Sequence, residues 1–222
     1  MRANLRILFV VVSVFAAAVP ASAQTARART TSVKPSIGVF GLFDSSTIAA
    51  KSSFDAVFGK HTTTAPGMGV EVINLWKNVF VRAAVSQSSL SGERVIVFNS
   101  DVFKLGIPLT AELTPIEFGG GWRFASKNPA ARFTPYAGAS FVTLKYKETS
   151  SFADSSDNTD QSYAGFGLFG GVDVRIARRV FGGVEGQYRS ITFTPSTNSA
   201  SASFNENNLG GATVRVRLGV RF

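Results

Sequence analysis

The end of the chain alternates strictly between apolar and mostly cationic side chains. One face carries Val214, Val216, Leu218, Val220 and Phe222, and the other carries Arg215, Arg217 and Arg221. Side chains of a β-strand point to opposite faces with a period of two, so one face can meet hydrocarbon while the other keeps its charges away from it. Residues 209–222 are therefore predicted to form a membrane-spanning strand.

Similar alternating segments recur between turn-rich stretches along the chain. They lie at 36–44, 67–76, 79–90, 107–124, 133–148, 162–176, 179–192 and 209–222. An even number of antiparallel strands returns both ends of a barrel to the same side, which is the rule for bacterial single-chain outer-membrane barrels. The pattern predicts an all-β fold, an eight-stranded antiparallel transmembrane β-barrel with up-and-down topology, over residues 36–222.

The connections between these segments alternate in length. Short links at 76–79, 125–132 and 177–179 are expected to face the periplasm together with both termini. The longer, mostly polar connections are expected to form surface loops outside the cell, at 45–66, 91–106, 149–161 and 193–208. No helical period competes with the strands, so no helix is predicted.

The apolar positions suggest which face of each strand meets lipid. In segment 133–148 the even positions from Tyr136 to Tyr146, including Val142 and Leu144, are expected on the lipid face. In segment 107–124 the apolar parity changes, which predicts a bulge near Thr114 and Pro115 that leaves Leu109, Ala111 and Leu113 facing lipid. Segment 36–44 fits either phase and is left open.

The first residues have the pattern of a cleaved export signal. Arg2 and Arg6 precede an apolar run at 7–19, which ends at the small residues 21–23. This run is shorter than the roughly 20 residues that a helix needs to span a bilayer. We therefore expect a signal peptide at 1–23, a flexible basic periplasmic tail at 24–35 and a mature protein in the bacterial outer membrane.

Composition narrows the classes of partner. The chain has no cysteine, which excludes a disulfide-based scaffold, and its formal net charge is +9. Its arginines are spread singly through alternating strands, and the sequence has neither a basic helix nor a nucleic-acid motif. Nucleic-acid binding is therefore not expected, and anionic lipid headgroups or lipopolysaccharide-like partners are a better match to the charge.

Charged residues on the faces assigned to the interior are the main candidate site. They are Glu71, Arg82, Glu112, Glu117, Arg123, Lys145, Asp173, Arg175, Glu185, Arg189, Arg215, Arg217 and Arg221. An eight-stranded barrel is just wide enough for side chains to fill, and a buried unpaired ion is costly. Opposite charges are therefore expected to pair and to plug the lumen. The alternative is a narrow, mildly basic path for anions or small solutes.

Aromatic residues lie near both ends of the predicted strands. We expect an aromatic girdle at the two water interfaces, formed by Trp76, Trp122, Phe124, Tyr136, Tyr146 and Tyr188. Ordinary strand propensity explains any single one of these residues equally well. The distribution of the whole set is what favours a membrane barrel.

Residues 36–222 resemble the small eight-stranded outer-membrane barrels of the OmpA, OmpX and OmpW kind. The resemblance rests on the signal peptide, the segment beginning at Phe133, the glycine-rich run 165–172 and the ending 208–222. It implies that Phe222 is an assembly signal read by the barrel-insertion machinery, and that outer-membrane lipid surrounds the barrel. It also implies a structural or surface-interaction role, with any extracellular ligand held by the loops.

Motifs for catalysis or metal binding are weak. His61 has Asp55 as its nearest acid, but a surface histidine is the commoner explanation. The acidic stretch 154–160 lacks the later glutamate and central glycine of a calcium loop. We therefore predict no enzyme, catalytic residue, cofactor or metal. A membrane-barrel enzyme and a soluble lipocalin-like lipid carrier remain alternatives.

Overall fold

The computed structural model describes residues 34–98, 101–124, 131–150, 158–195 and 199–222. The predicted signal peptide and most of the predicted tail lie outside these residues. The strands are β1 (Ser36–Ile48), β2 (Thr62–Ile73), β3 (Val79–Ser86), β4 (Ser88–Phe98), β5 (Asp101–Arg123), β6 (Phe133–Thr149), β7 (Thr159–Arg175), β8 (Val180–Ile191) and β9 (Gly211–Arg221). Two short helices accompany them, α1 (Lys51–Phe58) and α2 (Ala200–Ser203). No helix of the described residues is long and apolar enough to cross a membrane.

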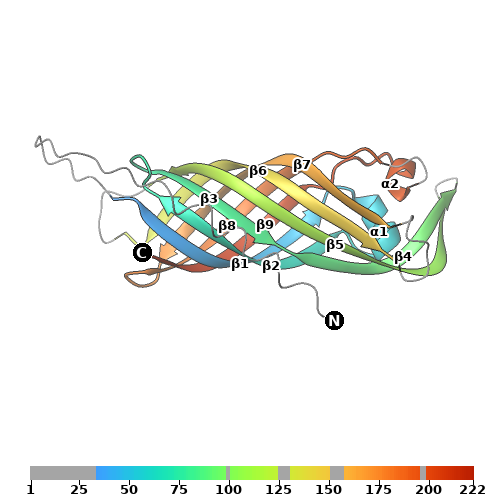
Figure 1. Ribbon diagram of the computed structural model, residues 1–222, viewed down its shortest axis with the longest axis horizontal. Helices are drawn as coiled ribbons and strands as arrows, with labels where there is room; N and C mark the ends of the chain where they lie inside the picture. Colours follow the sequence, from blue (N-terminus) through green and yellow to red (C-terminus); the bar gives the residue numbers. More distant parts are fainter. Residues whose placement is uncertain (1–33, 99–100, 125–130, 151–157, 196–198) are drawn as a thin grey trace, which may run out of the picture. The chain divides into compact units, whose positions relative to one another are not determined.

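The strands close into one antiparallel barrel (Figure 1). Strand β1 pairs with β9, and β3 pairs with β5, so the first and last barrel strands meet. Strands β3 and β4 act as one barrel strand, because Val85 pairs with Ile116 and Ser88 with Leu113 in the same register along β5. The predicted eight-stranded antiparallel barrel is confirmed.

The two ends of the barrel differ. The turns between β2 and β3 and between β7 and β8 lie at one end, here the turn end, together with Phe222, whose backbone N–H donates to the carbonyl of Ile37. The opposite, loop end carries α1, α2 and the β4–β5 hairpin (Figure 1). The short turns therefore share one end of the barrel and the longer connections share the other, the arrangement predicted from the lengths of the connections.

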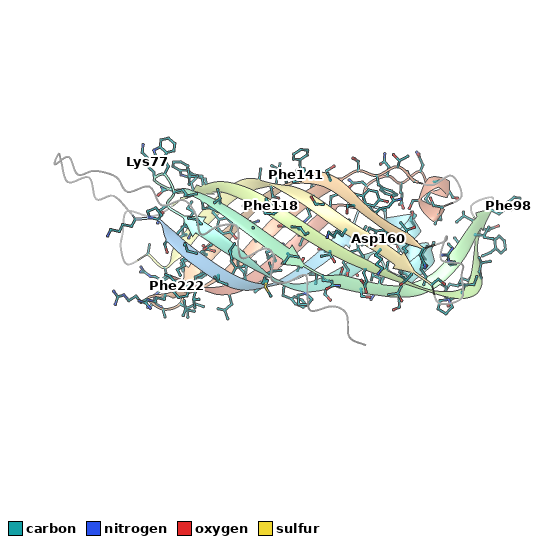
Figure 2. All side chains as sticks on the ribbon, in the orientation of Figure 1. Lys77, Phe98, Phe118, Phe141, Asp160 and Phe222 are labelled. Atoms are coloured by element: carbon teal, nitrogen blue, oxygen red, sulfur yellow. The ribbon has the colours of Figure 1, made fainter. Side chains whose placement is uncertain are left out.

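The outer surface of the barrel is apolar. Figure 2 shows Phe118 and Phe141 on this surface, where their side chains are 50% and 42% exposed. In β9 the exposed positions include Val214, Val216, Leu218 and Val220, as the alternation predicts. The phase of β1, which the sequence left open, places Ile37, Val39 and Phe43 outside and Phe40, Leu42 and Asp44 inside.

The predicted faces of β6 and of the first half of β5 are wrong. Tyr136, Val142, Leu144 and Tyr146 point into the barrel, and Leu109, Ala111 and Leu113 do the same. The register of β5 against β6 runs unbroken from Thr110 to Arg123, so there is no bulge near Thr114 and Pro115. The reason is that the interior is apolar at the loop end, where Ala111, Leu113, Val142, Leu144 and Tyr146 belong to one buried cluster, while Tyr136 packs in a second cluster with Ile73, Phe80 and Phe169.

This apolar cap closes the loop end of the interior. Its buried members come from both helical connections and from strand ends: Ile48, Ala50, Phe54, Leu90, Ala111, Leu113, Val142, Leu144, Tyr146, Ile191 and Leu209. Helix α1, which the sequence analysis did not predict, contributes Phe54. Its eight residues are too few to show a helical period, and its stability comes from packing.

Residues 91–106 also differ from the predicted polar loop. They continue β4 and β5 as a hairpin whose pairing extends to Phe98 and Asp101, with a register shift between Glu93 and Val95. The hairpin carries exposed apolar side chains, including Ile96, Phe98 and Phe103. Figure 2 shows Phe98 at its tip, away from the barrel wall. The β-branched and aromatic composition favours strand pairing over an irregular loop.

Candidate functional site in the barrel interior

A network of buried ion pairs fills the middle of the barrel. Arg215 on β9 is its centre, with Nε 2.7 Å from Asp44 Oδ1 and Nη1 2.9 Å from Glu117 Oε2. Its Nη2 donates to the second oxygen of each carboxylate, at 2.8 Å and 3.1 Å. Both contacts are bidentate, the geometry in which arginine and carboxylate bind most strongly. One guanidinium group therefore joins β1 to β5 through the lumen.

Arg189 extends this central layer towards the loop end. It lies 2.6 Å from Glu117 Oε1, and its Nη2 also donates to the Gln187 side chain at 3.0 Å. The hydroxyl of Ser86 donates to Asp44 at 3.1 Å. The carboxylates thus accept hydrogen bonds from several neighbours, as buried charges require.

Arg82 and Glu185 form the other part of the central layer. Arg82 donates to both carboxylate oxygens of Glu185, with Nη2 2.8 Å from Oε1, and the Tyr136 hydroxyl donates to Oε2 at 2.9 Å. The Arg82 guanidinium carbon lies 3.7 Å from the centre of the Phe169 ring, a cation–π contact. Tyr136 therefore serves the interior, which explains why β6 turns this residue inwards.

A second layer of ion pairs lies nearer the turn end. Arg217 bridges Glu71 at 3.1 Å and Asp173 at 2.5 Å, and Arg221 reaches the same two acids at 2.8 Å and 2.6 Å. Arg123 adds a third cation to Asp173, at 2.6 Å. Arg217 also lies among aromatic rings, 4.7 Å from the centre of Tyr136. The layer is compact because each carboxylate is shared.

The two layers hold six arginines and five carboxylates among the described residues, from every barrel strand except β6, which supplies the Tyr136 hydroxyl. Such groups are costly to bury and need excellent geometry to compensate. Removing one member of a buried pair typically costs about 3–5 kcal/mol, because the partner is left as an uncompensated charge. The layers therefore tie the register of the strands to the filling of the lumen.

The structure places all but three of the predicted interior charges in these layers. The exceptions are Glu112, Lys145 and Arg175, whose side chains are exposed. Glu112 and Lys145 lie on outward faces near the loop end, where headgroups and water replace hydrocarbon, and Arg175 ends β7 at the turn end. Asp44 was not among the predicted interior charges, because the phase of β1 was open.

The structure places four of the six predicted girdle residues on the outer surface and two in the interior. Trp76, Trp122, Phe124 and Tyr188 are on the outer surface, with exposed fractions from 38% to 67%. Tyr136 and Tyr146 are buried inside, so their assignment to the girdle is wrong. A tyrosine suits the interior because its ring fills space while its hydroxyl finds a polar partner.

A small cavity separates the central ion pairs from the apolar cap. It has a volume of about 40 Å³ and is lined by Asp44 and Arg189 on one side and by Ile48, Leu113 and Ile191 on the other. Arg189 Nε is buried without a hydrogen-bond partner among the described residues. The cavity is polar enough and large enough for water, but not for a larger solute.

At the loop end, the connection after β8 holds helix α1. The Glu206 carboxylate accepts hydrogen bonds from the backbone N–H groups of Ser52 and Ser53, at 2.8 Å and 2.9 Å, and from the Ser53 hydroxyl. Burial opposes ionisation of Glu206, but the hydrogen bonds from Ser53 and Ser52 lower its pKa below the usual value. Glu206 thus replaces the missing side-chain cap of α1.

The candidate catalytic pair, His61 and Asp55, lies at the loop end of the barrel. His61 Nδ1 is 2.8 Å from Asp55 Oδ1, so the pair joins the end of α1 to the start of β2. Within the described residues no group of three or more histidine, cysteine, aspartate or glutamate side chains is arranged to hold a metal. Asp154 and Asp157 of the acidic stretch lie outside those residues.

Comparison with known proteins agrees with this architecture. OprG of Pseudomonas aeruginosa shares the fold, with a TM-score of 0.55 at 12% identity over 85% of this chain and 95% of OprG. Ail of Yersinia pestis, in complex with the heparin analogue sucrose octasulfate, is similar at 12% identity and a TM-score of 0.49, over 85% and 97% of the two chains. The N-terminal β-barrel domain of Pseudomonas aeruginosa OprF gives 10% identity and a TM-score of 0.47, over 84% and 97%.

Sequence comparison supplies the family. No curated protein matches this sequence significantly. The family model described as "Outer membrane protein beta-barrel domain" matches residues 7–222, nearly the whole chain. The chain is therefore a bacterial outer-membrane protein that belongs to the outer-membrane β-barrel domain family.

Proposed function

We propose that this protein is a structural and surface component of the outer membrane whose lumen is closed. The observation that carries the proposal is the position of Arg215, which is hydrogen-bonded on one side to Asp44 and on the other to Glu117. A continuous path for ions would have to separate these charges, at a cost of several kcal/mol. Membership of the outer-membrane family removes the soluble lipid carrier as an alternative.

The loop end supports the same proposal. Above the ion pairs, the apolar cap and the small polar cavity leave space for water but not for a solute. Hydrated ions are strongly disfavoured in such apolar surroundings. The narrow pore is therefore the less favoured alternative.

Single-channel recording tests the closed lumen. The purified protein in planar bilayers should give no steady, large conductance. Glu112→Gln, which changes an exposed carboxylate outside the barrel, should likewise give no steady, large conductance. A steady large conductance of the unmodified protein would overturn the closed lumen in favour of the pore.

We also propose that the loop end of the barrel makes the surface interactions of the protein. The specific observation is the β4–β5 hairpin, which holds Phe98 at 66% and Phe103 at 53% exposure. Exposed apolar patches on a protein surface commonly mark sites of interaction with other molecules. We propose that the protein is not an enzyme, and that the His61–Asp55 pair supports the α1 connection. Lipase, acyltransferase or protease activity that is lost on His61→Ala would contradict this.

A further inference from the structure

The charged side chains exposed at the turn end are all positive among the described residues. They are Lys34, Lys77, Arg132, Arg175, Arg178 and Arg179. The carboxylate side chains near this end, Glu71 and Asp173, lie inside the barrel and are paired there. The exposed or half-buried acids lie towards the loop end instead, at Asp55, Glu93, Asp101, Glu112, Glu148, Asp160 and Glu206. The turn end therefore presents a basic surface.

Four of these arginines lie at the ends of neighbouring strands, and backbone hydrogen bonds hold these strand ends together. The N–H of Arg175 donates to the carbonyl of Arg132 at 2.8 Å, which joins the ends of β6 and β7. The N–H of Arg221 donates to the carbonyl of Arg179 at 2.7 Å, which joins β9 to the β7–β8 turn. Arg178 lies in that turn. The exposed residues Arg132, Arg175, Arg178 and Arg179 thus form one basic cluster at the turn end of β6, β7 and β8, whereas the Arg221 side chain turns inwards to Glu71 and Asp173.

An apolar groove lies beside this cluster on the outer face of the barrel. The register aligns Phe133, Val174, Gly182 and Leu218 in one row across four strands. Because Gly182 has no side chain, the row is low in the middle, where Ile176 Cδ1 lies 3.2 Å from the position that a Cβ would take, and an open apolar depression remains there on the outer face. Ile176 and Phe133 line it and are the immediate neighbours of Arg175 and Arg132.

We propose that this surface binds an anionic glycerophospholipid of the periplasmic leaflet. One acyl chain occupies the groove at Gly182, and the phosphate contacts the cluster of Arg132, Arg178 and Arg179. Arginine binds phosphate through its planar fork of N–H donors, and basic residues at a membrane surface attract anionic lipids. A lipid is favoured over an acidic polysaccharide because the groove is apolar and faces the bilayer.

The contribution of the arginine cluster is tested by measuring lipid binding to the purified full-length protein in detergent. Native mass spectrometry would compare phosphatidylglycerol with phosphatidylethanolamine of the same acyl chains. We expect phosphatidylglycerol to bind about tenfold more tightly, and Arg132→Gln, Arg178→Gln and Arg179→Gln together to remove most of that preference. The matched control removes three exposed loop-end cations, through Lys60→Gln, Lys104→Gln and Lys145→Gln, and should keep the preference.

Equal binding of the two lipids by the unmodified protein, or an unchanged preference in the triple arginine variant, would overturn the proposal. Arginine-dependent sedimentation with peptidoglycan, without lipid preference, would overturn it in favour of a polysaccharide partner.

The contribution of the apolar groove is tested by filling the groove with a larger side chain at residue 182. A Cβ at residue 182 would lie 3.2 Å from Ile176 Cδ1, the end of a flexible side chain, so Gly182→Val and Gly182→Ala are compatible with the backbone. Gly182→Val should weaken the binding of both lipids several-fold and keep the preference for phosphatidylglycerol. Gly182→Ala should have an intermediate effect. Unchanged binding of both lipids, in variants whose strand circular dichroism matches that of the unmodified protein, would show that the acyl chain lies elsewhere.

Discussion

Asp44 and Arg215 are cross-strand partners at the seam where the barrel closes, with β1 on one side and β9 on the other. Arg215 Nε lies 2.7 Å from Asp44 Oδ1, and Nη2 lies 2.8 Å from Oδ2. The two residues are 171 positions apart in the chain. The ion pair that fills the centre of the lumen is therefore also a contact between the first and last strands.

Asp44→Ala is expected to destabilise the folded barrel strongly. The substitution leaves Arg215 without one of its two bidentate partners, which should lower the free energy of unfolding by about 3–5 kcal/mol. Guanidinium unfolding in detergent micelles, followed by circular dichroism, measures this. Glu112→Ala removes an exposed carboxylate and should cost less than about 1 kcal/mol. Equal effects of the two substitutions would mean that the Asp44–Arg215 pair contributes little.

The attachment of helix α1 should depend on pH through Glu206. The folded-state pKa of Glu206 lies below its usual value, so its hydrogen bonds to Ser52 and Ser53 contribute fully above pH 4.5. The contribution is lost as the pH falls below 4.5 and passes through the lowered pKa. The amide chemical shifts of Ser52 and Ser53 should follow this titration. In Glu206→Gln they should no longer do so, and an identical titration in that variant would exclude Glu206 as the cap.

Phe222→Ala is expected to reduce insertion into the outer membrane without reducing synthesis. Phe222 is 72% exposed at the end of the apolar face of β9, where an insertion factor can reach it. The ratio of protein in the outer-membrane fraction to total protein measures the effect. Phe118→Ala, which removes an exposed aromatic side chain from the middle of β5, is the control. If both variants insert equally well, Phe222 has no special role in assembly.

Shortening the β4–β5 hairpin should leave the barrel intact and remove any binding by this surface. Replacing 94–107 with Asn-Gly joins Glu93 to Pro108, which are paired residues, through a two-residue turn suited to hairpins. The melting temperature should change little, because the deleted residues lie beyond the part of β5 that pairs with β6. Adhesion to cells or surfaces should fall. Unfolding of the shortened protein would show that the hairpin supports the barrel.

The alternation of β7, β8 and β9 was sufficient to predict their orientation. In each of them one face carries charged or polar residues, such as Asp173, Glu185 and Arg217, and the other carries valine, leucine or aromatic residues. Charges in the hydrocarbon region are expensive, so only one phase of such a strand is possible. The count of strands and the antiparallel closure followed from the same pattern.

For strands β1, β5 and β6, only the tertiary structure shows which face points into the barrel. Their inner faces are apolar over much of their length, because β5 and β6 contribute to the apolar cap, and Phe40 and Leu42 of β1 pack with Ala84 and Phe181 in another buried cluster. Apolar side chains then occur on both faces, and a period of two cannot tell which one is inside. Lys145 can point outwards because it lies close to the water interface, and Asp44 is assigned to the interior only once β1 pairs with β9.

The local sequence thus specified a membrane barrel and most of its interior charges, because hydrocarbon excludes unpaired ions from the outer face of each strand. Which guanidinium group meets which carboxylate was decided by the closure of the barrel. Closure brings residues from distant parts of the chain, such as Arg215 and Glu117, within 2.9 Å of each other. Such contacts depend on the register of every strand between them, and no local pattern contains that information.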